Sequence, residues 1–345
     1  MGLQLKDLII KKEIALSDLA GKTLAVDSMN ILYQFLTTIR GPDGSVLTDH
    51  RGHVTSHLIG LFNRTTSLME QGIKLIFVFD GKPPQLKQKT WEKRSAVKAE
   101  ASLKLKVAEE AGDYEEMRKF ASRTTVLTKE MITDAQALIT LLGLPIIQAP
   151  SEGEAQAAHV VKKGHAYAVV SQDYDTLLFG CPRVVRNLSI EGRRKKAGTV
   201  GFQTVKPELV DLKDVLAHLQ ITQEQLVHMA MLMGTDYNPG GIKGIGPKKA
   251  LTLSKQYSFN DPALFDAVQW STHFPDLSWQ ELHKTITTIP VTDDYALSWK
   301  PCRDKEIQRL LIEEHGFSAD RVHAKLEKLY KSKASTAQEG LSRFF

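Results

Sequence analysis

Three short apolar runs in this sequence are each followed closely by an aspartate. The runs and their acids are residues 22–26 with Asp27, residues 74–79 with Asp80, and residues 167–171 with Asp173. Runs of this length and composition are typical of strands buried on both faces of a parallel sheet. Amphipathic helical patterns separate them, so we expect an α/β fold with a central, mostly parallel sheet flanked by helices. Ligands in such sheets bind beyond the carboxyl ends of the strands, where the three acids would converge.

Three further acids stand close to the third run, namely Glu152, Glu154 and Asp175. Ser151 and Glu154 also fit a capping box, and acids after strands can be turn formers, so a purely structural role stays open for this stretch. A group of six carboxylates cannot remain ionised without cations. Oxygen ligands without neighbouring His or Cys favour Mg²⁺ or Mn²⁺, and a pair of ions about 4 Å apart is a standard arrangement for phosphodiester hydrolysis.

Bulk composition is that of a soluble globular protein of 345 residues, with 25% charged residues and a net charge of +5. This charge permits a polyanionic partner without demanding one. No apolar run approaches the roughly 18 residues of a membrane span, and the first ten residues lack the layout of a signal peptide. Cys181 and Cys302 are isolated, which suits a reducing intracellular compartment.

Residues 82–106 are strongly basic, and Lys87, Trp91, Arg94 and Lys98 share one helical face. A solvated charged helix is the alternative, but the interleaved Trp and the position after Asp80 favour a phosphate-gripping surface. We expect residues 82–130 to form a helical insertion over the site. Residues 183–188 have the pattern of an edge strand.

The stretch 240–250 is rich in glycine and lysine and follows an apolar helix. It fits a hairpin between two helices whose exposed N–H groups hold a phosphate backbone, although a glycine-rich turn without a ligand is the alternative. Residues 331–337 are small and polar and are expected to be disordered. In the last eight residues, Leu341, Phe344 and Phe345 would share one face of a helical turn, as in a docking peptide.

Five segments together closely resemble the archaeal form of the flap structure-specific endonuclease family, which belongs to the XPG/RAD2-type 5′-nuclease superfamily with a PIN-like fold. The segments are VFDGKPPQLK (78–87), APSEGEAQAA (149–158), VVSQDYDTLLFG (169–180), GTDYNPGGIKGIGPKKAL (234–251) and QEGLSRFF (338–345). They occur in the family's order, and the resemblance covers nearly the whole chain.

The resemblance implies roles for individual residues. The metal ligands would be Asp27, Asp80, Glu152, Glu154, Asp173, Asp175 and Asp236. Lys87 and Arg94 match the basic residues at the scissile phosphate. The candidate DNA contacts are Tyr33, Arg40, Arg64, Trp91, Lys98, Gly241, Lys243, Gly244, Gly246, Lys248 and Lys249. The helical pattern alone makes Tyr33 a core residue, whereas the resemblance makes it an aromatic that stacks on a base. The sliding-clamp motif would be Gln338, Leu341, Phe344 and Phe345.

The resemblance also implies a division of the chain. Residues 1–330 would be a single nuclease domain, and residues 331–345 a flexible tail with the clamp motif at 338–345. The regions within the domain would be an N-terminal nuclease region at 1–98, the helical arch at 82–130, an internal nuclease region at 131–225, a helix–two-turn–helix region at 226–257 and C-terminal helices at 258–330.

As a whole, the implied protein is a monomeric enzyme of the archaeal cytoplasm that cuts 5′ flaps with two Mg²⁺ ions. Mn²⁺ can substitute, and a K⁺ ion is expected at the 240–250 hairpin. The partners would be branched DNA and the sliding clamp (proliferating cell nuclear antigen), in Okazaki fragment maturation and long-patch base excision repair, and no membrane is involved. A 5′–3′ exonuclease or gap activity would accompany flap cleavage.

Two alternative functions have less support in the sequence. A Mg²⁺-dependent aspartyl phosphatase needs Asp-x-Asp-x-Thr after a strand, but Thr176 directly follows Asp175, one place too early. A clamp-associated protein that binds DNA structures without catalysis is the non-enzymatic alternative, and the intact set of seven acids argues against it.

Overall fold

The computed structural model describes the backbone of residues 5–41, 44–121, 124–188, 192–195, 202–257 and 262–342. The chain divides into two compact units, each assembled from three separate segments. The first unit comprises Met1–Ala15, Val78–Arg94 and Gln148–Asp293, and the second comprises Leu16–Phe77, Ser95–Ile147 and Asp294–Phe345. β3 (Lys74–Phe79), α3 (Gln88–Ala111) and β4 (Ile146–Gln148) each run across a boundary between these segments.

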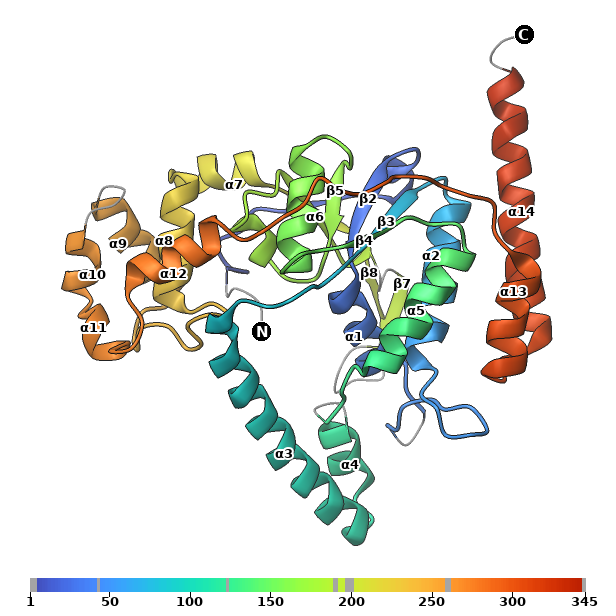
Figure 1. Cartoon of the computed structure of the whole chain (residues 1–345), viewed down its shortest axis with the longest axis horizontal. Coiled ribbons are helices and arrows are strands. Elements are labelled where there is room, and N and C mark those ends of the chain that lie inside the picture. Colours follow the sequence, from blue (N-terminus) through green and yellow to red (C-terminus); the bar gives the residue numbers. More distant parts are fainter. Residues whose placement is uncertain are drawn as a thin grey trace. The chain divides into compact units, whose positions relative to one another are not determined.

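The first unit holds most of the short strands and the helices between residues 153 and 287, which run from green to orange in Figure 1. Its strands are β1 (Lys12–Glu13), β5 (Ala168–Val170), β6 (Arg183–Arg186), β7 (Gly192–Lys195), β8 (Phe202–Val205) and β9 (Glu208–Asp211). Its helices are η2 (Gln85–Lys87), α6 (Gly153–Lys162), η3 (Asp175–Leu177), α7 (Leu212–Leu219), α8 (Gln223–Met233), α9 (Pro247–Gln256), α10 (Pro262–Ala267), α11 (Trp270–His273) and α12 (Trp279–Thr287). Four of the strands are adjacent in the order β1-β9-β6-β5, and β7 pairs with β8.

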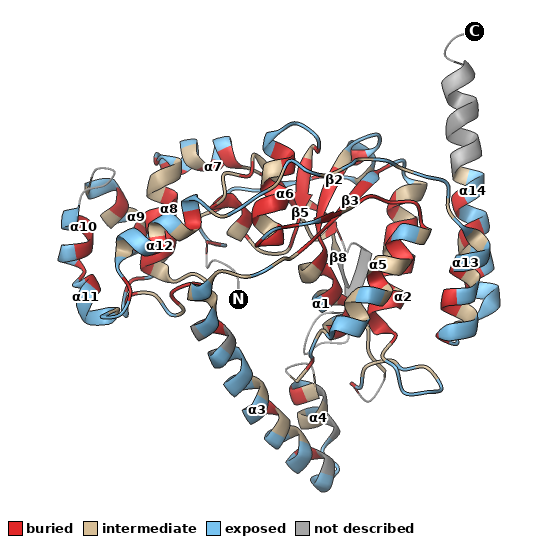
Figure 2. Cartoon of the chain, viewed as in Figure 1, coloured by how far each residue is buried: buried red, intermediate tan, exposed pale blue. Residues whose placement is uncertain are grey.

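The second unit has three adjacent strands in the order β2-β3-β4, with β2 at Thr23–Asp27. Its helices are η1 (Leu16–Leu19), α1 (Ser28–Thr38), α2 (Ser56–Glu70), most of α3, α4 (Tyr114–Ala121), α5 (Lys129–Leu141), α13 (Asp304–Gln308), the π-helix η5 (Arg309–Glu314) and α14 (Ala319–Ser342). The apolar residues of β2, β3 and β5 are almost completely buried, as the sequence predicted (Figure 2). The fold is therefore a mostly parallel mixed sheet flanked by helices.

β6 is an interior strand, so the prediction of an edge strand at residues 183–188 is wrong. It pairs in parallel with β5, where Val169 faces Val184, and antiparallel with β9, where Val184 faces Val210. Val184 and Val185 are fully buried. The arginines at the two ends of this strand suggested exposure, but long cationic side chains can extend from a buried strand toward its ends.

The predicted hairpin between two helices is confirmed in α8, α9 and the loop that joins them, and the two helices pack on each other (Figure 1). Within the loop the backbone of Gly241 crosses the end of α8, where Ile242 N–H donates to the carbonyl of Leu232 at 2.8 Å. A Cβ on Gly241 would lie 2.3 Å from the carbonyl carbon of Met233. Gly241 is also in the left-handed region, with φ +57°. Only glycine meets both conditions.

The expected helical insertion at residues 82–130 contains α3 and α4, and most described side chains of α3 are exposed (Figure 2). Among the described residues, no helix is long and apolar enough to span a membrane. α14 continues through Ser342, so residues 331–337, which were expected to be disordered, are helical. Alanine and lysine in this stretch are good helix formers, and the small polar residues between them do not interrupt the helix.

Replacing Gly241 with alanine should lower the free energy of unfolding by about 2 kcal/mol or more, because the new Cβ would collide with backbone atoms that cannot move separately. Gly244→Ala is the matched control, since Gly244 also has positive φ but nothing lies within 4 Å of its Cβ position. Gly244→Ala should lower the free energy of unfolding by only about 1 kcal/mol, which is the effect of placing a residue with a Cβ in the left-handed region. Urea denaturation of both variants measures the difference, and equal losses would contradict the close approach.

Candidate active site

Asp80, the acid that follows β3, is held by the segment that leads into α6. Its Oδ1 accepts a hydrogen bond from the N–H of Gly153 at 2.7 Å, and its carbonyl accepts one from Gln148 Nε2 at 2.6 Å. A Cβ on Gly153 would lie 2.6 Å from Asp80 Oδ1. The glycine between Glu152 and Glu154 therefore lets the carboxylate of Asp80 approach the start of α6.

A second glycine allows the same two segments to meet through their backbones. Gly81 donates its N–H to the carbonyl of Ser151 at 2.6 Å. A Cβ on Gly81 would lie 2.0 Å from the carbonyl oxygen of Ala149. These contacts place Asp80 and Glu152, which are far apart in sequence, on neighbouring loops of the first unit.

Glu152, not Ser151, is the N-cap residue of α6, and its side chain makes no capping hydrogen bond. The capping-box interpretation of this stretch is therefore wrong. Glu152 is 5% exposed. One of its oxygens, Oε2, accepts a hydrogen bond from Lys87 Nζ, whereas the other, Oε1, is buried without a hydrogen-bond partner. A buried carboxylate oxygen without a donor is costly, and it is a position where a cation can bind.

Lys87 and Arg94 both contact the carboxylate of Asp236, the acid that follows α8. Lys87 Nζ lies 3.5 Å from Asp236 Oδ2, and Arg94 Nη2 lies 2.6 Å from Oδ1. The hydroxyl of Thr90 donates to the carbonyl oxygen of Asp236. Three side chains at the start of the 82–130 insertion thus contact one aspartate.

The turn that carries Asp236 is stabilised by Asn238, which is 1% exposed. Asn238 Oδ1 accepts from the N–H of Thr235 at 2.9 Å, and its Nδ2 donates to the carbonyl of Met231 at 2.7 Å. The side chain therefore links the turn to the last part of α8.

Burial and charge act in opposite directions on the titratable groups here. Burial raises the pKa of Asp80, and Lys87 opposes this effect only in part. The pKa of Glu152 is raised for the same reasons. Burial alone would lower the pKa of Lys87, but Glu152 and Asp236 outweigh it and raise that pKa. The ammonium is therefore the stable form of Lys87 while it stands between the two carboxylates.

Four acids of the first unit act on the phenol of Tyr237. Burial raises its pKa, and the charges of Glu152, Glu154, Asp236 and Asp175 add to the increase. A phenol surrounded by carboxylates resists ionisation, because a further negative charge would be unfavourable there.

The donor set has the chemistry of a divalent-metal site, although its side chains do not form one as they stand. Carboxylate oxygens are the ligands that hard divalent cations prefer, and Glu152 Oε1 is a buried oxygen without a hydrogen bond. Among the described residues, no three His, Cys, Asp or Glu are grouped so that they could hold an ion. Lys87 and Arg94 instead supply the positive charge at Glu152 and Asp236. The residues fit a divalent cation that replaces this positive charge.

The other predicted ligands are placed as follows. Asp173 lies in the loop after β5, and Asp175 begins η3; both are half-buried. Glu154 is in the first turn of α6. Asp27 belongs to the second unit, where it is 2% exposed and caps α1 by accepting from Asn30 N at 3.1 Å. Its association with the other six acids stays a prediction.

Two candidate DNA contacts, Tyr33 and Lys98, meet within the second unit. Tyr33 is 38% exposed, so the helical pattern that made it a core residue was misleading. Lys98 Nζ lies 5.7 Å from the centroid of its ring. Arg40 is half-buried, donating to the carbonyl of Gly44 at 2.8 Å and to the hydroxyl of Thr125. Arg64 lies in α2, where it has interactions within the protein.

Three lysines of the 240–250 loop and the start of α9 are exposed, namely Lys243, Lys248 and Lys249. α9 begins with Pro247 after Gly246, which offers no side-chain cap, so N–H groups at this end can bind an anion. The side chain of Trp91 lies outside the described residues. The same holds for the side chains of Gln338 and Leu341, which are in α14, and for Phe344 and Phe345 entirely.

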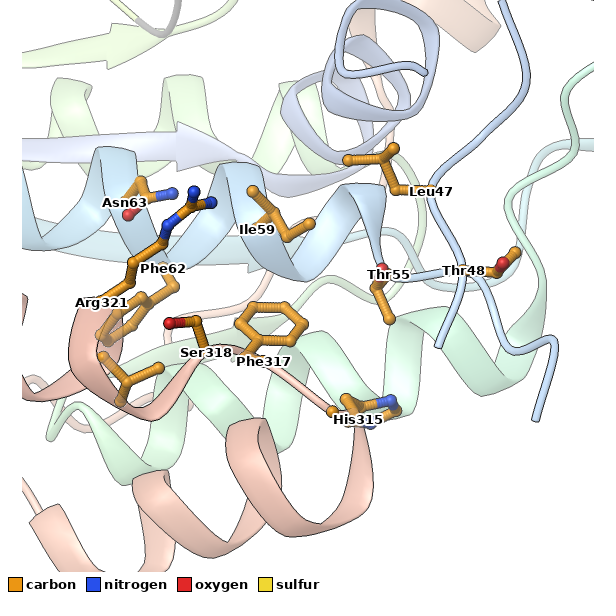
Figure 3. A pocket seen from close by; sticks show the side chains of 12 residues that line it. Leu47, Thr48, Thr55, Ile59, Phe62, Asn63, His315, Phe317, Ser318 and Arg321 are labelled. Atoms are coloured by element: carbon orange, nitrogen blue, oxygen red, sulfur yellow. The ribbon is translucent and has the colours of Figure 1, made fainter. Parts of the chain in front are cut away.

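A pocket in the second unit was not predicted from the sequence. It has a volume of about 330 Å³ and lies between the loop before α2, α2 itself and the start of α14. Figure 3 shows Ile59 and Phe317 on its apolar side and Arg321 beside Asn63. No motif marks these residues, because they are brought together only by the packing of α14 on α2. Thr90 was missed because its contact with Asp236 joins segments far apart in sequence. Asn238 and Gly153 lie within the segments quoted above and could have been found there.

Two family models match this chain. The XPG N-terminal domain matches residues 1–101, and the XPG I-region matches residues 143–236. Together they cover more than half of the chain and include all seven predicted metal ligands. These two matches, together with the mostly parallel sheet flanked by helices, define a nuclease of the XPG type.

Individual relatives identify one family within the XPG-type nucleases. Flap endonuclease 1 of Pyrococcus abyssi is 50% identical over 345 residues, which cover 100% of this chain and 98% of the relative. Flap endonuclease 1 of Staphylothermus marinus is 46% identical and is covered completely. The chain belongs to the flap endonuclease 1 family. Nucleases of this family are metal-dependent, so membership supports a divalent-metal site.

Solved structures agree with this assignment. Flap endonuclease-1 from Methanococcus jannaschii superposes with a TM-score of 0.74 at 42% identity, covering 97% of this chain and 100% of that chain. The catalytic core of Rad2 in complex with DNA substrate has a TM-score of 0.69 at 21% identity, covering 95% and 100%, respectively. The second likeness shows a shared fold only.

Gly153→Ala should impair nuclease activity far more than stability. The new Cβ would displace the carboxylate of Asp80, which can rotate, so the free energy of unfolding should fall by less than about 1 kcal/mol. A misplaced carboxylate should lower the single-turnover rate about 100-fold. Gly81→Ala is the contrasting variant, because its Cβ would meet a backbone carbonyl and should destabilise the fold. Thermal melting and cleavage rates separate the two effects, and an unchanged rate in Gly153→Ala would contradict the role of Asp80.

Proposed function

We propose that this chain is a structure-specific 5′-flap endonuclease that hydrolyses phosphodiester bonds near single-strand/duplex junctions. The observation that carries the proposal is the contact of Lys87 and Arg94 with Glu152 and Asp236 beside the loop of Asp80. Acids and bases from separate segments meet here, and the relatives that share the whole chain are flap endonucleases. A 5′–3′ exonuclease or gap activity would use the same site.

We propose Mg²⁺ as the metal, with two ions per site and Mn²⁺ as a substitute. The residues that would hold them are Asp27, Asp80, Glu152, Glu154, Asp173, Asp175 and Asp236. Divalent ions supply a nucleophile at neutral pH and stabilise the charge of the phosphate oxygens. Their binding would replace the positive charge that Lys87 and Arg94 now provide.

Lys87 and Arg94 have a second role in this proposal. Both are cations attached to the start of the helical insertion, and both contact acids of the site. Once their carboxylates are neutralised by other cations, they are available to bind the scissile phosphate. Arg94 can do so with two parallel hydrogen bonds, whereas Lys87 acts as a point charge.

Contacts farther along the DNA come from several elements. Lys243, Lys248 and Lys249 are exposed around the α8–α9 loop and would bind the phosphates of the unbroken duplex, together with a K⁺ ion. Gly241, Gly244 and Gly246 let the backbone approach. Tyr33 and Lys98 offer an exposed aromatic ring with a neighbouring cation, a combination that suits a base and its phosphate. Trp91, Arg40 and Arg64 complete the proposed set.

The remaining proposals rest on the sequence resemblance. Residues 338–345 would bind the sliding clamp, residues 82–130 would form the arch that receives the flap, and the enzyme would act as a monomer in an archaeal cytoplasm. The proposed cellular roles are Okazaki fragment maturation and long-patch base excision repair. The runner-up is a clamp-associated protein that binds DNA structures without cutting them.

The function is tested by incubating the chain with labelled 5′-flap, nicked and fully duplex DNA, with and without Mg²⁺. The flap should be cut near the junction only with Mg²⁺. Asp80→Asn should slow cleavage at least about 100-fold, because it removes a ligand charge while keeping its shape and the Gly153 contact. The variant should still bind flap DNA. Asp293→Asn, an exposed acid of the same unit, is the control and should cut normally. Binding without cutting by the unmodified chain would instead favour the runner-up.

Lys87→Ala should lower the single-turnover rate about 100-fold, because a cation at the reacting phosphate is lost. The same variant should bind Mn²⁺ more tightly without DNA, by about tenfold, since an ammonium no longer neutralises Glu152 and Asp236. Calorimetric titration with Mn²⁺ measures this second effect independently of cleavage. Lys206→Ala removes an exposed lysine of an ion pair with Glu13 and serves as the control. Unchanged Mn²⁺ affinity in Lys87→Ala would rule out competition between the ammonium and the metal.

A further inference from the structure

Two arginines at opposite ends of β6 make the same pair of contacts with the segments on either side of β5. Arg183, at the first residue of β6, donates from Nε to the carbonyl of Tyr167 at 2.8 Å, and its guanidinium lies 4.5 Å from the centroid of that tyrosine ring. Arg186, at the last residue, donates from Nε to the carbonyl of Gln172 at 3.0 Å and lies 4.2 Å from the ring of Tyr174.

β5 and β6 are parallel, so the two arginines act at different ends of β5. Arg183 acts at the amino end, where Tyr167 precedes the strand. Arg186 acts at the carboxyl end, on the loop that carries Asp173 and Asp175. The two arginines thus make contacts of the same kind, but only Arg186 contacts the loop that carries the acids.

Arg186 holds this loop at two points that flank Asp173. Nε binds the carbonyl before Asp173, while Nη1 donates to the hydroxyl of Tyr174, the residue after it. Tyr174 is 4% exposed, and the guanidinium stacks on its ring. A planar cation that bonds to the backbone and stacks on a buried ring has little freedom to move.

The guanidinium of Arg186 also pairs with an acid on the neighbouring strand β9. Arg186 faces Glu208 across the antiparallel β6–β9 pair, with Nη1 3.4 Å from Oε2 of that glutamate. Glu208 Oε1 in turn lies 2.7 Å from Lys11 Nζ. The side chains of Arg186 and Glu208 are only 16% and 15% exposed, so the ion pair is partly shielded from water. A chain of contacts thus runs from the segment before β1, across β9 and β6, to the loop after β5.

We propose that Arg186 is a positioning residue that fixes the loop of Asp173 and Asp175 for divalent-metal binding, supported by Glu208. Arg186 would act through the backbone of Gln172 and through Tyr174, the two residues of this loop that it contacts. The inference rests on the proposed function, in which Asp173 and Asp175 are metal ligands. Groups that orient metal ligands typically contribute about 10- to 100-fold to metal affinity.

The test uses the full chain without DNA and titrates it with Mn²⁺ by calorimetry. Arg186→Gln should raise the Kd for Mn²⁺ at least about tenfold. Hydrogen exchange of the amides of residues 172–175 should become faster in the same variant. Tyr174→Phe removes only the hydroxyl and should weaken Mn²⁺ binding less than Arg186→Gln does. In flap cleavage, Arg186→Gln should be slow at limiting Mn²⁺ and should recover toward the unmodified rate at saturating Mn²⁺.

Arg183→Gln is the matched control, because it removes a carbonyl hydrogen bond and a ring contact of the same kind at the other end of β5. It should leave the affinity for Mn²⁺ unchanged. Arg186→Lys covers the case in which Arg186→Gln does not fold, since it keeps the charge near Glu208 but loses the planar group. This variant should also bind Mn²⁺ more weakly. Equal losses of Mn²⁺ affinity in the Arg183 and Arg186 variants, or no loss in either Arg186 variant, would overturn the proposal.

Asp173→Asn separates this proposal from the function on which it rests. If Asp173→Asn binds Mn²⁺ as tightly as the unmodified chain, the assignment of Asp173 as a ligand fails, and the positioning role fails with it. If Asp173→Asn weakens binding but both Arg186 variants do not, only the positioning role is wrong. Weaker binding in both supports the proposal.

Discussion

Repulsion between carboxylates is the constraint on which the rest of this site depends. Six acids of the first unit lie on the loop after β3, at the start of α6, after β5 and after α8. Such a group is stable only when positive charge is supplied, and Lys87 and Arg94 supply it at Glu152 and Asp236. Glu152 and Asp236 raise the pKa of Lys87 against the effect of burial. Burial raises the pKa of Asp80, and Lys87 offsets this increase only in part. A divalent cation carries twice the charge of an ammonium, so the group that now accepts Lys87 is also suited to a metal.

Bringing these acids together requires unusually close backbones, and glycines allow this at two places. Gly81 lies against the carbonyl of Ala149, and Gly153 lies against the carboxylate of Asp80. Their neighbours differ in how far they can yield, because a carbonyl is part of the chain whereas a carboxylate is the end of a short side chain. The first glycine therefore serves the fold, and the second serves the position of one functional group.

The sequence predicted the strands and the acids at their ends because burial on both faces leaves a plain apolar pattern. It predicted Glu152 as a functional acid but left open a capping box, which the structure excludes by making Glu152 the N-cap without a side-chain cap. β6 was misplaced at an edge because its arginines lie along neighbouring loops and tyrosines rather than in water. The helical pattern placed Tyr33 in the core, because periodicity alone cannot distinguish a buried position from one at the edge of the buried helix face. Contacts between segments far apart in sequence, such as Thr90 with Asp236, have no local pattern that could predict them.

The start of α3 has little apolar burial to hold it in place, since most described side chains of this helix are exposed. Its sequence favours a helix, but propensity alone does not fix where a helix begins or points. In the first unit, Thr90 and Arg94 attach the first turns of α3 to Asp236, and Lys87, just before the helix, pairs with Glu152. The contacts that neutralise the acids are thus the contacts that anchor the helix. Because one set of ion pairs performs both tasks, a change of charge at the acids must also change the free energy that holds the start of α3. A divalent cation that bound at Asp236 would therefore also change the contacts that hold the start of α3.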